Sequence, residues 1–175
     1  FGDNHKWGTF PAVSLGWRIS REPWLKDAKW LNELKLRAGF GITGNQEIGN
    51  YRSLSILRKG SSNFYYNKKW ISTYEPGSNP NPDLRWEKKK EFNVGLDMSV
   101  LDNRLNVTVD YYNRRTKDLL YTYTVPVPPN LYPSKFANVG TIDNKGIEVT
   151  VNATPISRKN FSWNLAATIS HNKNN

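Results

Sequence analysis

The chain has 175 residues, of which 37% are hydrophobic, 13% are aromatic and none is cysteine, and its formal net charge is +10. This aromatic content excludes a disordered polypeptide, and no apolar run approaches the length of about 18 residues that a membrane-spanning helix needs. Lysine and arginine are spread over expected loops and strand ends and are not concentrated on one helix, so no nucleic-acid partner is expected.

Residues 9–20 and 33–42 alternate apolar with polar side chains, which predicts two β-strands that each have one apolar and one polar face. Residues 21–32, between these strands, are expected to form a turn or one short helix. Residues 43–85 are rich in Asn, Gly, Ser and Pro, which predicts a long loop. The apolar positions of the two strands are Val13, Leu15, Trp17, Ile19, Leu34, Leu36, Ala38, Phe40 and Ile42.

Residues 91–100 and 105–115 show the same alternation and are predicted to form a β-hairpin. Asp102 and Asn103 lie between them and tolerate positive φ, as a two-residue hairpin turn requires. The register set by this turn places apolar residues opposite apolar residues, whereas a slip of one residue would place them opposite polar ones. In the predicted register Asp97 lies opposite Thr108, and Asp110 lies opposite Gly95.

A second long loop is predicted for residues 117–144, followed by strands at 145–153 and 161–170. Short and long connections therefore alternate between six successive strands. This alternation is typical of outer-membrane barrels, which turn briefly on the periplasmic side and carry long extracellular loops. We therefore expect an all-β fold, an antiparallel transmembrane β-barrel. Because six strands do not close such a barrel, the chain is expected to be a fragment whose edges pair with other strands.

Small polar side chains dominate the polar faces of these strands, which indicates a wide barrel with a water-filled or plugged interior. Four charged residues are predicted to face this lumen and to contact a plug or water: Arg37, Asp97, Asp110 and Glu148. Asp97 and Asp110 are also a conceivable carboxylate pair for glycoside hydrolysis.

The sequence lacks a recognisable catalytic or metal-binding motif. His5 and His171 are the only histidines, and they are far apart in sequence. The spacing Gly39-x-Gly41-x-x-Gly44 matches a dinucleotide fingerprint, but a loop rich in Pro and Asn follows it where nucleotide binding needs a helix. We therefore predict no catalytic residue, no metal ligand, no cofactor and no enzymatic activity.

Aromatic residues in the two predicted long loops are candidates for contact with a substrate or partner: Trp70, Tyr74, Tyr121 and Tyr123. Such side chains offer flat apolar platforms to sugar rings, although they also serve to pack loops together or against another protein. A further hypothesis concerns Lys88, Lys89 and Lys90, the one tight run of cations. It is expected near the outer rim, where it would meet anionic lipid phosphates.

Two stretches carry a recognisable signature, namely Leu34–Gln46 (LKLRAGFGITGNQ) and Asn81–Glu87 (NPDLRWE). Three further blocks agree with them, at Trp7–Arg18, Val109–Leu120 and Asn138–Glu148. In this order, and over nearly all 175 residues, the blocks resemble the SusC/RagA-type TonB-linked (TonB-dependent) outer-membrane transporters.

The resemblance implies that the chain comes from the C-terminal half of a barrel of about 22 strands, whose N-terminal plug domain is absent from this sequence. It implies import of oligosaccharides or peptides across the bacterial outer membrane, with force from the TonB complex. A SusD-like surface lipoprotein would close the barrel mouth, and outer-membrane lipid and lipopolysaccharide would surround the wall. The residues alone leave two alternatives: a soluble carbohydrate-binding β-sandwich, and an outer-membrane adhesin or enzyme barrel.

Overall fold

The computed structural model describes residues 1–3 and 5–175. Within these residues the secondary structure consists of β-strands and one short 3-10 helix, η1 (Ile19–Arg21). No helix in this part of the chain is long and apolar enough to cross a membrane. The chain divides into two compact units. The sheet unit comprises Phe10–Thr43, Lys89–Thr116 and Ile142–Asn175, and the loop unit comprises Phe1–Thr9, Gly44–Lys88 and Lys117–Thr141.

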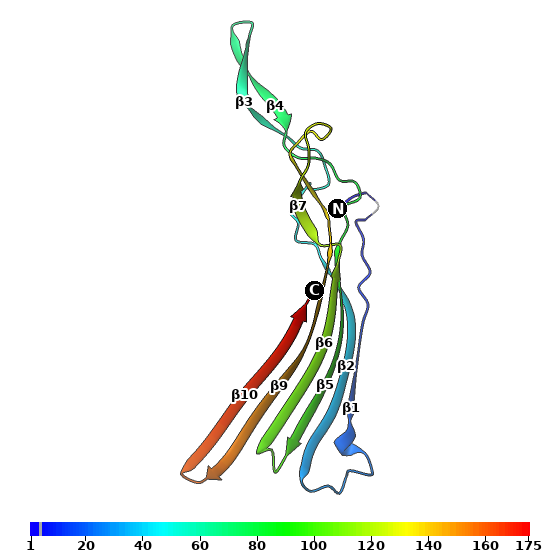
Figure 1. The fold of residues 1–175 in the computed structure, drawn as a ribbon, viewed down its shortest axis with the longest axis vertical. Coiled ribbons are helices and arrows are strands. Elements are labelled where there is room, and N and C mark those ends of the chain that lie inside the picture. Colours follow the sequence, from blue (N-terminus) through cyan, green and yellow to red (C-terminus); the bar gives the residue numbers. More distant parts are fainter. Residues whose placement is uncertain (4) are drawn as a thin grey trace. The chain divides into compact units, whose positions relative to one another are not determined.

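The sheet unit is built on a single six-stranded sheet (Figure 1). Its strands lie side by side in chain order and are β1 (Ala12–Arg18), β2 (Leu31–Asn45), β5 (Glu87–Val100), β6 (Leu105–Lys117), β9 (Thr141–Arg158) and β10 (Phe161–Asn174). Each strand pairs with the next one in this series, as in the wall of an up-and-down barrel. The predicted all-β fold class is confirmed, and the strands do not split into the two packed sheets of a β-sandwich.

The pairing registers separate the side chains of the sheet into two faces. At the β1–β2 edge Leu15 lies opposite Ala38 and Trp17 lies opposite Leu36, so apolar residues meet apolar residues. The same holds between β9 and β10, where the apolar pairs are Trp163–Ile156, Leu165–Ala153, Ala167–Val151 and Ile169–Val149. We call the face that carries these residues the apolar face and the opposite one the polar face.

All six predicted strands differ from the observed strands at one end or both, and two of these differences matter for the side chains of the sheet. Ile19 was expected on the apolar face of the first strand but lies in η1, because β1 ends at Arg18. The fifth predicted strand was expected to end at residue 153, yet β9 continues to Arg158. A bulge places Thr154 and Pro155 opposite Asn164 alone. A bulge tolerates proline because the residue there need not donate a ladder hydrogen bond.

The turn between β5 and β6 has the predicted conformation. Asp102 and Asn103 have φ of 55° and 63°, and Leu101 also has a positive φ, 55°. The amide of Arg104 donates to the carbonyl of Leu101 at 3.1 Å and closes the turn. Thr108 contacts Asp97 across the hairpin, in agreement with the register expected from this turn.

The loop unit contains two hairpins that the sequence-based prediction missed. Residues 43–85 were expected to form a loop, but they include β3 (Leu57–Tyr66) and β4 (Lys69–Pro76). Residues 117–144 likewise include β7 (Leu120–Thr124) and β8 (Ser134–Asn138). In the first hairpin Asn67 and Lys68 both have positive φ. A two-residue turn of this kind matches the right-handed twist of the strands beside it, so these residues form the tight turn between β3 and β4.

Candidate functional site

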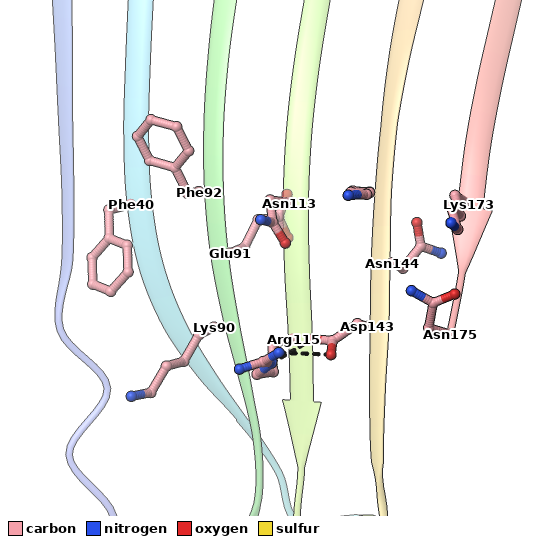
Figure 2. A pocket seen from close by; sticks show the side chains of 11 residues that line it. Phe40, Lys90, Glu91, Phe92, Asn113, Arg115, Asp143, Asn144, Lys173 and Asn175 are labelled. Atoms are coloured by element: carbon pink, nitrogen blue, oxygen red, sulfur yellow. Dashed lines mark hydrogen bonds and ion pairs between the residues drawn. The ribbon is translucent and has the colours of Figure 1, made fainter.

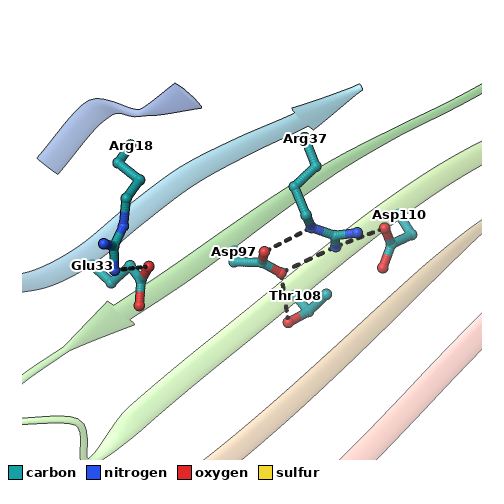
Figure 3. Close-up of polar contacts among 6 residues, drawn as sticks. All are labelled: Arg18, Glu33, Arg37, Asp97, Thr108 and Asp110. Carbon is teal, nitrogen blue, oxygen red and sulfur yellow. Dashed lines mark hydrogen bonds and ion pairs between the residues drawn. The ribbon is translucent and has the colours of Figure 1, made fainter. Parts of the chain in front are cut away.

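An arginine bridge on the polar face joins three neighbouring strands (Figure 3). Arg37 on β2 donates from Nε to Asp97 Oδ2 at 2.7 Å and from Nη2 to Asp97 Oδ1 at 3.1 Å, which makes a bidentate pair with β5. The same Nη2 donates to Asp110 Oδ1 on β6 at 2.9 Å. Thr108 Oγ1 donates to Asp97 Oδ1 at 3.3 Å. One guanidinium therefore holds two carboxylates from different strands.

Gly95 on β5 makes this bridge sterically possible. A Cβ at this position would lie 2.6 Å from Arg37 Nη2 and would also collide with Asp110 Oδ1. The absence of a side chain lets Arg37 cross β5 and reach β6. The sequence-based prediction placed Gly95 opposite Asp110, and the structure shows that this glycine leaves room for the cation of a third strand.

The arginine bridge changes the chemical role that is expected of Asp97 and Asp110. Asp97 and Asp110 were considered as a pair for glycoside hydrolysis or as contacts to a plug or water. Both accept hydrogen bonds from Arg37, which neutralises part of their charge, while their contact with a plug or water stays a prediction. A carboxylate held by a guanidinium is a poor general acid, so this geometry favours cross-linking of strands. Glu148, the fourth predicted lumen residue, is exposed on β9, lies opposite Ser170 and is not part of the bridge.

A second ionic group includes Glu91, whose carboxylate lies 3.2 Å from Lys89 Nζ and 3.0 Å from Arg114 Nε. The Arg114 guanidinium also lies 4.8 Å above the ring of Tyr112. The hypothesis that Lys88, Lys89 and Lys90 meet lipid phosphates stays a prediction, but Lys89 is engaged with Glu91 and the three side chains do not share one face. Because side chains alternate along β5, Lys89 points to the face opposite Lys90.

The loop aromatics predicted to contact a substrate or partner lie on the two hairpins of the loop unit. Trp70 and Tyr74 are on β4, with 71% and 70% of their surface exposed, and Tyr121 on β7 is 63% exposed. Tyr123, also on β7, is exposed to a smaller extent. Trp70 contacts Tyr65, its cross-strand neighbour, with ring centroids 5.1 Å apart. The sequence signal for this hairpin is Asn67 between two aromatic-rich runs.

Asparagine side chains of the loop unit bind backbone groups of another segment. Asn79 is 6% exposed, and its Nδ2 donates to the carbonyls of Tyr132 and Ser134 at 2.5 and 2.8 Å. Its Oδ1 accepts from the amides of Leu131 and Tyr132, both at 3.1 Å. Asn81, also 6% exposed, donates to the carbonyl of Phe136 at 2.9 Å. These amides tie residues 79–81, at the start of the NPDLRWE stretch (Asn81–Glu87), to the second long loop.

The NPDLRWE stretch is also anchored near its C-terminal end, at Arg85. Asn138 Oδ1 accepts from the Arg85 amide at 2.9 Å, while Asn138 Nδ2 donates to the Arg85 carbonyl at 2.7 Å. Arg85 also pairs with Asp118 at 2.8 Å. Leu84 between these contacts is fully buried. The NPDLRWE stretch therefore serves to hold the two loops together, a role that sequence reasoning did not assign.

The described residues contain no group of three or more His, Asp or Glu side chains that could hold a metal ion. The arrangement therefore offers hydrogen bonds, charges and aromatic surfaces.

Comparison with known proteins matches the whole chain to one family. The model of the TonB dependent receptor-like β-barrel matches residues 1–175. TonB-dependent receptor P39 of Formosa agariphila is 42% identical over 175 residues, which cover 99% of this chain and 16% of that protein. TonB-dependent receptor SusC of Bacteroides thetaiotaomicron is 39% identical over 177 residues, with 99% and 18% covered. The chain thus spans less than a fifth of the length of these relatives.

Solved structures show the same fold. The RagAB peptide importer in its closed-closed state superposes with a TM-score of 0.86 at 30% sequence identity, over 99% of this chain and 18% of that one. The open-open state of the same importer gives a TM-score of 0.85 at the same identity and coverage.

Proposed function

The chain belongs to the TonB-dependent receptor-like β-barrel family, and from this premise we propose that it forms part of the wall of an importer for oligosaccharides or peptides. SusC- and RagA-like receptors are outer-membrane nutrient importers, and the chain is an outer-membrane β-barrel element of this type. In the proposed importer, TonB supplies the force and a SusD-like lipoprotein covers the barrel mouth.

The observation that carries this proposal is the two-faced sheet. One face presents aliphatic and aromatic side chains that are exposed in the isolated unit, among them Leu15 at 73% and Ile169 at 74%. The other face carries the arginine bridge of Arg37. A wall with lipid on one side and water on the other requires this separation. The proposed role of the wall includes no catalytic step. Import requires a polar passage that opens when a plug moves, and the wall bounds that passage.

The polar face is proposed to line that passage. Arg37, Asp97, Asp110 and Glu148 would then be lumen-facing, and the arginine bridge would hold three strands in register while a plug is displaced. Cross-linked strands resist the shear that such a movement imposes, because the ion pairs of Arg37 join β2 both to the adjacent β5 and to β6 beyond it. The proposed role of the bridge is therefore mechanical.

The loop aromatics are proposed to contact the imported nutrient or the lipoprotein. Trp70, Tyr74 and Tyr121 combine high exposure with large flat rings, and such rings stack on sugars and on aromatic side chains. Exposed apolar area of this kind usually marks a recognition surface.

The proposal is tested on the full-length polypeptide that contains this sequence, purified from its native outer membrane. We expect a surface lipoprotein to copurify with it, and we expect mass spectrometry of the bound material to identify an oligosaccharide or a peptide. Uptake of that compound should stop when the TonB complex is inactivated. Uptake that continues without TonB would contradict the proposal.

The loop aromatics need a separate variant. Replacing Trp70 and Tyr74 together by alanine should reduce lipoprotein recovery or uptake by about tenfold, the effect expected when exposed aromatic anchors of an interface are lost. Trp24→Ala is the matched control, because Trp24 is also well exposed, at 67%, but lies in the short connection between β1 and β2. Equal effects of the two changes would exclude a specific role for β4.

A further inference from the structure

Four cations project from neighbouring strands on the apolar face, close to the ends of the strands that lead into the long connections. They are Lys90 on β5, Arg115 on β6, Lys145 on β9 and Lys173 on β10, and we call them the basic rim. All four are exposed. Together with Phe40 and Phe92 they line one shallow depression of about 440 Å³ (Figure 2).

The spacing along each strand places the basic rim on the apolar face. Lys90 is two residues from Phe92, and Lys145 is two residues from Ile147, so each pair shares a face. Lys145 lies directly opposite Lys173 in the β9–β10 register. In Figure 2 Lys90 and Arg115 lie further toward the long connections than Phe92 does. The cations therefore follow the apolar residues where lipid acyl chains give way to head groups.

The basic rim has an excess of positive charge. Arg115 forms a bidentate pair with Asp143, from Nε to Oδ1 at 2.5 Å and from Nη2 to Oδ2 at 2.8 Å. In the described part of the chain no carboxylate lies within 4 Å of the ammonium groups of Lys90, Lys145 or Lys173. Neighbouring like charges on a lipid-facing surface are costly unless an anion lies among them.

An apolar groove adjoins the basic rim on its membrane side. It is a shallow, open groove of about 350 Å³, lined by Tyr111, Lys145, Gly146, Ile147, His171 and Lys173. Lysine stems lie along apolar surfaces while their ammonium groups reach the polar layer. A groove for an acyl chain beneath a cluster of cations matches a ligand that has both fatty acids and phosphate.

We propose that the basic rim binds the phosphate groups of lipid A, the membrane anchor of lipopolysaccharide, in the outer leaflet, with an acyl chain in the groove beside Tyr111 and Ile147. This inference rests on the proposed function for its orientation, since the long connections must face the outside. Polar-face residues take no part, because the four cations point away from the proposed passage. The site holds the barrel in its membrane and does not select the nutrient.

The test uses the full-length protein in detergent, titrated with phosphorylated lipid A and with the same lipid A after enzymatic removal of its phosphates. In the test variant the four rim cations are replaced by glutamine: K90Q, R115Q, K145Q and K173Q. The matched control replaces three lysines of the short connections and the arginine at the adjoining end of β9: K26Q, K29Q, K159Q and R158Q. Each cation near anionic head groups strengthens binding by up to about tenfold. Loss of all four should therefore weaken the binding of phosphorylated lipid A at least about tenfold.

The proposal expects wild type and control to bind the phosphorylated form alike and the dephosphorylated form weakly. Binding of both forms with equal affinity, or a test variant that binds like wild type, would overturn it. Asp143→Asn is a second variant for the case that the fourfold variant does not fold. It removes the competing carboxylate, so lipid A should bind more tightly, and unchanged or weaker binding would overturn the proposal.

Nutrient uptake is measured in cells that produce the wild type, the test variant or the control. The proposal expects the fourfold variant to retain uptake while it loses lipid A, which separates the rim from the passage. Failure of the wild type to take up any oligosaccharide or peptide would refute the proposed function, whereas the titration would still decide the lipid site.

Discussion

Arg37 on β2 and Asp110 on β6 form an ion pair of 2.9 Å although β5 lies between their strands. The contact exists because Gly95 on β5 has no side chain at the crossing point. Three strands distant in sequence are thereby linked through one guanidinium. The first two predictions concern this link.

Replacing Arg37 by leucine should destabilise the barrel by about 1–2 kcal/mol, because Asp97 and Asp110 then lie near each other without a counter-charge. The loss is below that of a fully buried pair, since these side chains are still about one-third exposed, at 33% and 37%. Thermal unfolding of the full-length protein, followed by its heat-dependent mobility on gels, measures the change. Arg18→Leu is the control, since Arg18 and Glu33 form a more exposed pair on the same face. Equal losses would contradict the special role of the bridge.

Gly95→Ala should also destabilise the protein, because the new methyl group collides with the Arg37 guanidinium. In a background where Arg37 is already alanine, the methyl group no longer meets the guanidinium, and Asp110 is no longer held in place by it, so the same change should cost less. A double-mutant cycle on unfolding free energies should therefore show a coupling of about 1 kcal/mol. Additive effects of the two changes would mean that Gly95 does not serve the bridge.

A charge on the apolar face should prevent assembly into the membrane, whereas a charge on the polar face should be tolerated. Ile169→Arg is expected to cost about 2–4 kcal/mol if the side chain lies near the bilayer midplane. Thr168→Arg is the matched control, since Thr168 is the adjacent residue on β10 and faces the opposite way. The amount of folded protein in the outer membrane measures the difference. Similar losses for both variants would refute the assignment of the two faces.

Loss of the Asn79 side chain should loosen the second long loop without affecting the sheet. Asn79→Ala removes four hydrogen bonds to the backbone of residues 131–134 and leaves some of those groups unsatisfied. Amide hydrogen exchange in residues 126–136 should accelerate about tenfold or more, while exchange in β9 and β10 stays unchanged. The exposed Asn63 in β3 supplies the control, Asn63→Ala. Unchanged exchange in the loop would show that these bonds contribute little.

The sequence reliably predicted those features that depend on neighbouring residues. The alternation in β5 and β6 gave both faces, and the positive φ of Asp102 and Asn103 agrees with the turn predicted from their residue types. The hairpin of β3 and β4 was missed, because its strands lie in a segment rich in Gly, Ser and Asn that masks the short aromatic runs. The run Lys88–Lys90 does not reveal in the sequence alone which of its side chains share a face with Phe92, because adjacent residues of a strand face opposite sides.

Sequence by itself therefore determined the six strands of the large sheet, their two faces and, through its motifs, the family. The tertiary structure alone decided which side chains meet across strands that are far apart in the chain. Arg37 lies 73 residues from Asp110, and Lys90 lies 83 residues from Lys173, a distance of about 270 Å if that segment were fully extended. Local preferences fix the direction of each side chain, but only strand order and register fix its neighbours. The arginine bridge and the basic rim depend on that order.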